Sequence, residues 1–458
     1  MKFVLCLKKI ILKKRNFLIL VFVFNFLLAM PQTWFLGLRI VKETIKNNIF
    51  IEKIEEKIKG SNEYQFDSES LVLGRIITDK INLENSGKFL VRIENKEIKD
   101  EKKSFLNTVY YPKINLLTSS EIEKNWDLKI YNQQFGLQGS FFSFLYNTLN
   151  LSNVNMLYII NVLCTSFIII YLLNWIYCEF GSIAMFFSAI QFLVFTHFFK
   201  MERNLYWVMW TWFFPMCASI YSMKNNKREL YHYVSIFYLI ILPFTSILLK
   251  CLNGYEFISN ILINMEIPVI YYSLKKKEKL SLLIKKCSIV GISGILGFFA
   301  AVILHLKKLL LWTSSFNETL NIFFYPIFYR TNLFGYKLQM NSEKVDFIKN
   351  NFEILEKSLT SSSIYVIMMY LSNIKIKIVI FLLFIFIIND LRKKENVLLI
   401  ISILLSFIGV LSWLILAKGH SYIHIPINVN LWNIPFLMLS FAYFGLQFEK
   451  YILKRRRK

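Results

Sequence analysis

The chain has 458 residues, of which 55% are hydrophobic and 17% aromatic, and its mean hydropathy is +0.45. This apolar content exceeds what a soluble domain needs, and much of it lies in runs of about 18 or more residues, long enough to cross a bilayer as helices. The formal net charge of +24 comes largely from Lys and Arg in short loops between these runs. This placement is typical of cytoplasmic anchoring loops and argues against nucleic-acid binding, which needs a basic soluble face.

The cysteines favour neither disulfides nor a metal site. None of the six lies in the two long polar segments, and no two have the C-x-x-C spacing. We therefore expect them to be small apolar core residues. They are Cys6, Cys164, Cys178, Cys217, Cys251 and Cys287.

The chain begins with basic residues, followed by an apolar run over 17–38. A secretory signal is the alternative, but Ala29-Met30-Pro31-Gln32 makes a poor cleavage site and hydrophobicity resumes at Trp34. We therefore predict that residues 1–38 hold a cytoplasmic N-terminus and an uncleaved first transmembrane helix.

Residues 39–150 form a polar segment of mixed charge that we expect to be an extracytoplasmic loop with α/β-like structure. It contains strand-like pieces such as 88–93 and two acids, Asp67 and Glu69, two positions apart. The segment ends in a short aromatic stretch that reaches Leu149, which predicts an interfacial or re-entrant helix.

Nine further apolar runs predict the remaining transmembrane helices, making about ten in an all-α polytopic membrane protein. The approximate runs are 153–175, 180–199, 204–222, 231–249, 255–273, 287–304, 374–390, 397–417 and 432–448. Helices 2–7 fall within 151–304, and helices 8–10 with a basic tail fall within 374–458. No internal repeat of the kind found in many transporters is visible.

The basic residues predict the orientation of these helices. Alternation from a cytoplasmic N-terminus places the Lys- and Arg-rich connections inside, at 224–228, 275–286, 392–394 and 450–458. The chain is then expected to lie in the cell (plasma or inner) membrane with both termini in the cytoplasm. Both long loops, 39–150 and 305–373, lie outside.

The unusual polar and aromatic residues fall on the predicted outer side. A D-x-E pair alone is a weak motif, and the other residues each have a structural alternative. Trp and Tyr are common at the membrane interface, Arg and Lys can reach headgroups, and a lone His pair seldom binds a metal. Glu266, within a predicted helix, is a further functional candidate. The candidate substrate-binding residues are Gln138, Arg203, Tyr206, Trp207, Trp312, Arg330, Lys418, His420 and His424.

This arrangement resembles the GT-C class of membrane glycosyltransferases, which carry catalytic acids in the first outer loop. Four short pieces are similar to those of poorly characterised bacterial members: Asp67-Ser68-Glu69, Gln134-Phe135-Gly136-Leu137-Gln138-Gly139, Arg203-Asn204-Leu205-Tyr206-Trp207 and Gly419-His420-Ser421-Tyr422-Ile423-His424. In much of the class the acid follows the first helix closely. Asp67 comes nearly thirty residues after it, so residues 43–59 would have to form an interfacial helix that folds back.

The resemblance implies transfer of a sugar from a polyprenyl-phosphate donor to an acceptor at the outer face. Asp67 would be the general base, and Glu69 would either orient it or bind a divalent metal as a cofactor. Residues for the lipid phosphate would be Arg203, Arg330 and Lys418. Tyr206 and Trp312 would stack on the sugar or line the polyprenyl groove, and His420 and His424 would bind the phosphate or the acceptor.

Three alternatives remain open at this point. A lipid-linked-sugar flippase or carrier would move the same molecule without chemistry. A polysaccharide polymerase would share the substrate class but usually centres on one large loop late in the chain. A non-catalytic membrane scaffold would leave the convergence of polar motifs without a function.

Overall fold

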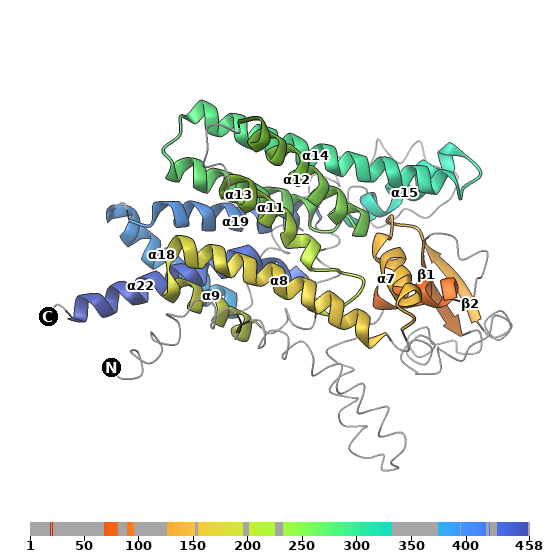
Figure 1. The fold of residues 1–458 in the computed structure, drawn as a ribbon, viewed down its shortest axis with the longest axis horizontal. Helices are drawn as coiled ribbons and strands as arrows, with labels where there is room; N and C mark the ends of the chain where they lie inside the picture. Colours follow the sequence, from red (N-terminus) through yellow and green to blue (C-terminus); the bar gives the residue numbers. More distant parts are fainter. Residues whose placement is uncertain are drawn as a thin grey trace, which may run out of the picture.

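The computed structural model is mostly helical, and long helices such as α8, α14 and α19 run along its long axis (Figure 1). A β-hairpin and α7 lie at one end, which we call the hairpin end, and the C-terminus lies at the opposite end. The structure describes residues 19, 21, 68–80, 89–95, 126–151, 154–195, 201–224, 232–331, 374–393, 395–417, 421 and 428–456.

The first polar segment contributes a helix over 68–80 and an antiparallel hairpin of β1 (Leu90–Asn95) and β2 (Trp126–Tyr131). β1 overlaps the strand predicted over 88–93. The helix α7 (Leu137–Thr148) follows β2 after a short turn. Gly136 has φ +76°, a conformation that favours glycine, and a Cβ there would lie 3.0 Å from the side chain of Leu90. This glycine therefore permits the close packing of α7 against β1.

The helical body is built from pairs of packed helices. α12 packs on α14, α13 on both α11 and α19, and α9 on α22. The helices are α8 (Asn155–Phe180), α9 (Ser182–Val194), α11 (Trp210–Lys224), α12 (His232–Asn253), α13 (Ile258–Lys275), α14 (Leu280–Leu310), α15 (Phe316–Thr331), α18 (Ile374–Lys393), α19 (Val397–Leu416) and α22 (Met438–Arg456). A 3₁₀ turn (Val429–Trp432) and a π turn (Asn433–Leu437) precede α22.

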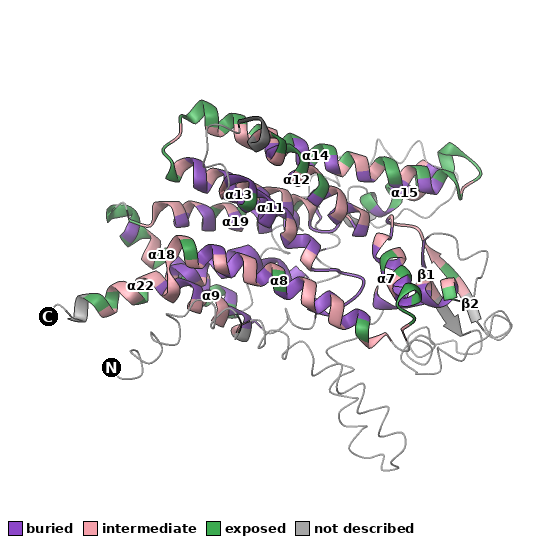
Figure 2. Cartoon of the chain, viewed as in Figure 1, coloured by how far each residue is buried: buried purple, intermediate pink, exposed green. Residues whose placement is uncertain are grey.

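Five segments in the described part of the chain are long and apolar enough to cross a membrane, as expected for a helical membrane protein. They are Asn155–Phe180, Ile236–Asn253, Leu280–Leu310, Val397–Leu416 and Asn430–Leu453. The predicted count of ten therefore stays a prediction, and the first predicted helix lies almost wholly outside the described residues. Along α14, apolar side chains such as Ile292, Phe299 and Ile303 are exposed, as a lipid-facing surface requires (Figure 2).

Three boundaries differ from the sequence prediction. The run over 204–222 begins as an irregular turn, and its helix starts at Trp210, because Val208 has φ 44° and the side chain of Asn204 bonds the backbone of the turn. The run over 432–448 starts within a distorted stretch, since Ile434 has non-helical φ and ψ. α14 extends past residue 304 to Leu310, and α15 follows, so the start of the 305–373 segment is helical.

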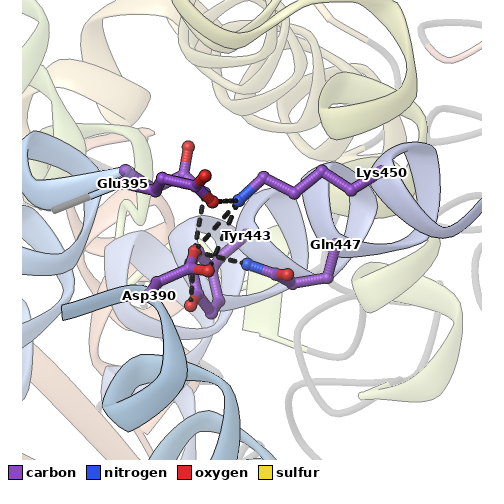
Figure 3. Close-up of polar contacts among 6 residues, drawn as sticks. Asp390, Glu395, Tyr443, Gln447 and Lys450 are labelled. Carbon is purple, nitrogen blue, oxygen red and sulfur yellow. Dashed lines mark hydrogen bonds and ion pairs between the residues drawn. The ribbon is translucent and has the colours of Figure 1, made fainter. Parts of the chain in front are cut away.

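The C-terminal end is held by a buried carboxylate on α18. Asp390, whose side chain is 1% exposed, accepts hydrogen bonds from Asn396 Nδ2 at 2.7 Å, Tyr443 OH at 3.0 Å and Gln447 Nε2 at 2.6 Å (Figure 3). Lys450 Nζ lies 3.3 Å from the same carboxylate. Because its acceptor capacity is filled from within the chain, we assign this cluster a structural role in joining α18 to α22.

The hairpin end is held by the last turns of α14. His305 Nε2 donates to the carbonyl oxygen of Asn132 at 3.1 Å, and its Nδ1 accepts from Tyr255 OH at 3.2 Å. Lys308 donates to the carbonyl of Phe135 and lies over that residue's ring. The end of α14 therefore fixes the turn between β2 and α7 through hydrogen bonds to its backbone.

Candidate functional site

The centre of the candidate site is the buried turn over 201–209, which leads into α11. Asn161 of α8 holds the shape of this turn, because its Nδ2 donates to the carbonyls of Glu202 and Asn204, each at 3.0 Å. The side chain of Asn204 then accepts from the backbone N–H of Tyr206 at 2.9 Å, as asparagine often does in turns. These bonds fix the backbone on both sides of Arg203.

Glu69 reaches this turn from the first polar segment. Its side chain is buried, and its Oε1 accepts the backbone N–H of Leu205 at 3.2 Å. The hydroxyl of Tyr158 also donates to Glu69, and the Arg203 guanidinium lies 5.1 Å from the centre of the Tyr158 ring. A carboxylate, a phenol and a guanidinium from three distant parts of the chain thus form one buried group.

Arg203 is 5% exposed, and its Nη1 makes no hydrogen bond within the described part of the chain. A buried guanidinium loses its hydration, and an unpaired N–H on it is costly. An arginine held this way is suited to an oxyanion such as a phosphate, which can accept from its planar N–H groups.

A second layer of the site comes from the hairpin and α7. Gln138 Nε2 donates to the carbonyl of Tyr206 at 3.3 Å, and the hydroxyls of Tyr131 and Tyr206 lie 3.3 Å apart. The rings of Tyr206 and Trp207 pack edge to face at 5.0 Å. The first polar segment therefore meets the turn at both Glu69 and α7.

Five of the predicted site residues meet in this region: Glu69, Gln138, Arg203, Tyr206 and Trp207. Trp312 instead packs against Phe89 beside β1, with ring centres 5.9 Å apart. Glu266 lies on α13, where its Oε1 approaches Gly291 of α14. The remaining predictions lie outside the described residues or have side chains outside them: Asp67, Arg330, Lys418, His420 and His424.

Residues that the motifs did not single out also contribute. Tyr158 and Asn161 sit within an apolar run that predicted only a transmembrane helix, and Gln134 was noted only as part of a motif. The side chain of Gln134 is fully buried and its Oε1 points at Gly254, where a Cβ would lie 2.7 Å away. The one sequence signal for this role is that Asn161 is a polar residue within the apolar run over 153–175.

A small cavity lies deeper in the helical body, between α11, α13 and the stretch over 428–437. Its walls include the amides of Asn260, Asn264 and Asn430 and the rings of Trp212 and Phe257. Asn264 Nδ2 donates to Asn260 Oδ1 at 3.0 Å. Irregular backbone at membrane depth is tolerated where it lines a cavity or is buried in protein, and the distorted turns before α22 meet that condition.

Among the described residues, no group of three or more His, Cys, Asp or Glu could hold a metal ion. Glu69 already receives hydrogen bonds from Leu205 and Tyr158. These bonds fit a carboxylate that orients a neighbour better than one that ligates a metal.

Comparisons with known proteins give no relative for this chain. No family model matches it, and neither the curated proteins nor the solved structures contain a match. The function of this chain therefore has to be inferred from its own residues.

Proposed function

We propose that this chain is an integral membrane glycosyltransferase that transfers a sugar from a polyprenyl-phosphate donor to a cell-envelope glycan, glycolipid or protein acceptor. The observation that supports it best is the seating of Glu69 on the turn that carries Arg203. An acid beside a guanidinium with an open N–H fits a reaction between a hydroxyl and a sugar phosphate. The hairpin end would then lie outside the membrane.

The proposed reaction forms one bond and breaks one. The acceptor hydroxyl oxygen attacks the anomeric carbon while the bond from that carbon to the phosphate oxygen breaks, and the bonding electrons leave with the polyprenyl phosphate. Asp67 takes the hydroxyl proton, which is worth about 10²–10⁴ in rate for a positioned base. Arg203 stabilises the negative charge that grows on the phosphate.

Glu69 supports this chemistry from its buried position. Its hydrogen bond to Leu205 joins the 68–80 helix to the turn. We expect Asp67, which precedes Glu69 by two residues and lies outside the described residues, to act close to Arg203. Arg330, Lys418, His420 and His424 are the other proposed contacts to the phosphate or the acceptor. Trp312, a residue that is 44% exposed and packs on Phe89 beside β1, would line the path of the polyprenyl chain.

Two substitutions test the proposal. Membranes containing the full chain would be given polyprenyl-phosphate hexoses with tritiated sugars, and transfer of label to the envelope fraction would be measured. We expect Asp67→Asn to lower transfer by about 10²–10⁴-fold, and Glu69→Gln to lower it by about tenfold or more. The matched control is Glu318→Gln, an exposed acid in the first turn of α15, which should leave transfer unchanged. Retained transfer in both test variants would remove the acids from the mechanism.

A lipid-linked-sugar carrier is the second candidate, favoured by the distorted stretch before α22 beside an amide-lined cavity. A carrier would move the donor without breaking its glycosyl bond. Liposomes that hold a fluorescent polyprenyl-phosphate sugar, supplied with an envelope-fraction acceptor and an external quencher, separate the two. Quenching of the inner pool without release of polyprenyl phosphate would favour the carrier, and release without movement would favour the transferase.

A further inference from the structure

Gln134 is a buried amide without a hydrogen bond at either end. Its side chain has no exposed surface, and neither Oε1 nor Nε2 finds a partner among the described residues. It stands directly between β2 and α7, in the turn that α14 holds through Asn132 and Phe135. The large majority of buried side-chain polar atoms are hydrogen-bonded, so an amide with neither end paired is unusual.

Two further unpaired groups lie on the segments that meet this turn. Within the part of the chain that the structure describes, Gln138 Oε1 has no hydrogen bond although Nε2 of the same amide donates to Tyr206, and Trp207 Nε1 has none. Trp207 packs edge to face on Tyr206, and Tyr206 shares a hydroxyl contact with Tyr131 of β2. Gln138 and Trp207 therefore both adjoin Tyr206, and Gln134 follows Tyr131 by three residues in the turn after β2.

The chemistry of these groups points to a neutral ligand. Together they offer N–H donors on Gln134 and Trp207 and carbonyl acceptors on Gln134 and Gln138, and none carries a charge. A sugar hydroxyl donates and accepts at once, so neighbouring ring hydroxyls can satisfy both ends of an amide. A phosphate has no use for the acceptors and would prefer the guanidinium of Arg203.

We propose that Gln134, Gln138 and Trp207 bind the hydroxyl groups of the transferred sugar. This inference rests on the proposed function, and it divides the site into a neutral sugar subsite at the hairpin turn and a phosphate subsite at Arg203. The glycine at position 254 leaves space for the Gln134 side chain, because a Cβ there would lie 2.7 Å from Gln134 Oε1.

The test measures sugar binding apart from transfer. The full chain in lipid nanodiscs would be mixed with methyl glycosides of glucose, galactose, mannose and N-acetylglucosamine, and saturation-transfer NMR would detect contact with their ring protons. We expect at least one glycoside to give a signal that excess inorganic phosphate does not displace. Gln134→Ala should reduce that signal tenfold or more, and Gln134→Glu, which loses the N–H donors, should also reduce it.

The matched control is Gln191→Ala. Gln191 is also fully buried with both amide atoms unpaired, but it lies on α9, which packs against α22. We expect Gln191→Ala to give a saturation-transfer signal within twofold of that of the unchanged chain, and a Tm similar to that of Gln134→Ala. The absence of a signal from the unchanged chain, or an equal signal from Gln134→Ala, would overturn the subsite.

The outcome is separable from that of the proposed function. A signal that survives Asp67→Asn while transfer is lost supports both proposals. A Gln134-dependent signal in a chain that transfers no sugar would support the subsite and count against the transferase. An unchanged signal with a lowered Tm in Gln134→Ala would make Gln134 a structural residue and overturn the inference.

Discussion

At the scale of single residues, the candidate site depends on Asn161 as much as on any residue that would touch substrate. Its Nδ2 is shared between the carbonyls of Glu202 and Asn204, which flank Arg203. Because both carbonyls are in a buried turn, they have no water to replace this donor. One amide on α8 therefore sets the direction in which the Arg203 guanidinium leaves the backbone.

We expect Asn161→Ala to destabilise the protein by about 1–3 kcal/mol, because it removes two buried hydrogen bonds, to the carbonyls of Glu202 and Asn204, at about 0.5–1.5 kcal/mol each. The measurement is the Tm of the purified full chain. Thr165→Ala is the control on the same helix, since its hydroxyl only donates to the carbonyl of Asn161 one turn earlier, and it should cost about 1 kcal/mol or less. Equal Tm values for the two variants would show that the turn does not need Asn161.

The sequence identified the polar residues proposed to act on substrate better than the residues that support them. Glu69, Arg203 and Gln138 stand out because polar residues are conspicuous beside long apolar runs. Asn161 and Tyr158 do not stand out, because the sequence does not indicate which distant residue a single polar side chain within an apolar run will contact. Which face of α8 meets the turn is decided by packing, and packing is not visible in one sequence.

At the scale of elements, helix existence was easier to predict than helix limits. Apolar runs marked α8, α12, α14 and α19, but the run over 204–222 combined a buried turn with a helix. Both are apolar, since a turn enclosed by protein is as dry as a helix in lipid. The deciding signals are local, namely the capping side chain of Asn204 and the positive φ of Val208.

Close packing of α9 on α22 gives a prediction at this scale. A Cβ on Gly445 would lie 2.8 Å from the carbonyl oxygen of Ile183 and 2.9 Å from the Cα of Ala184. Since both atoms belong to backbone, the helices must move apart, and we expect Gly445→Ala to cost about 1–3 kcal/mol. The Tm of the full chain is the measurement.

Gly291→Ala on α14 provides the comparison. Its Cβ would meet only Glu266 Oε1, at 3.2 Å, the end of a flexible side chain. Alanine also favours a helix over glycine by about 1 kcal/mol, so Gly291→Ala should be neutral or slightly stabilising. A Tm for Gly445→Ala at or above that of Gly291→Ala would contradict the packing described for α9 and α22.

At the scale of the whole molecule, orientation is the property on which every functional statement depends. The sequence predicts it from the distribution of Lys and Arg, and the structure adds that the candidate site and the Asp390 cluster lie at opposite ends of the helical body. Among the described residues, those proposed to bind substrate lie on the turn over 201–209 and on the elements of the hairpin end, so we expect that end to face away from the cytoplasm.

Two single cysteines test this orientation in a chain whose six native cysteines are replaced. Asn317 in α15 and Lys279 before α14 are both exposed. In intact cells, Asn317→Cys should react with a membrane-impermeant maleimide, whereas Lys279→Cys should react only after the membrane is opened. The reverse labelling pattern would place the site in the cytoplasm and remove the proposed function.

The length of α14 has a consequence for how a lipid carrier reaches the site. Its 31 residues make a rod of about 46 Å, and the hydrocarbon layer is about 30 Å thick. Roughly 15 Å of the helix therefore extends beyond the hydrocarbon layer. The end of α14 is hydrogen-bonded to the turn between β2 and α7 through His305 and Lys308. The proposed site would thus be held at a fixed height above the acyl chains by a single helix. A thicker bilayer would raise the headgroups along α14, so bilayer thickness would set how far a lipid-linked sugar has to reach.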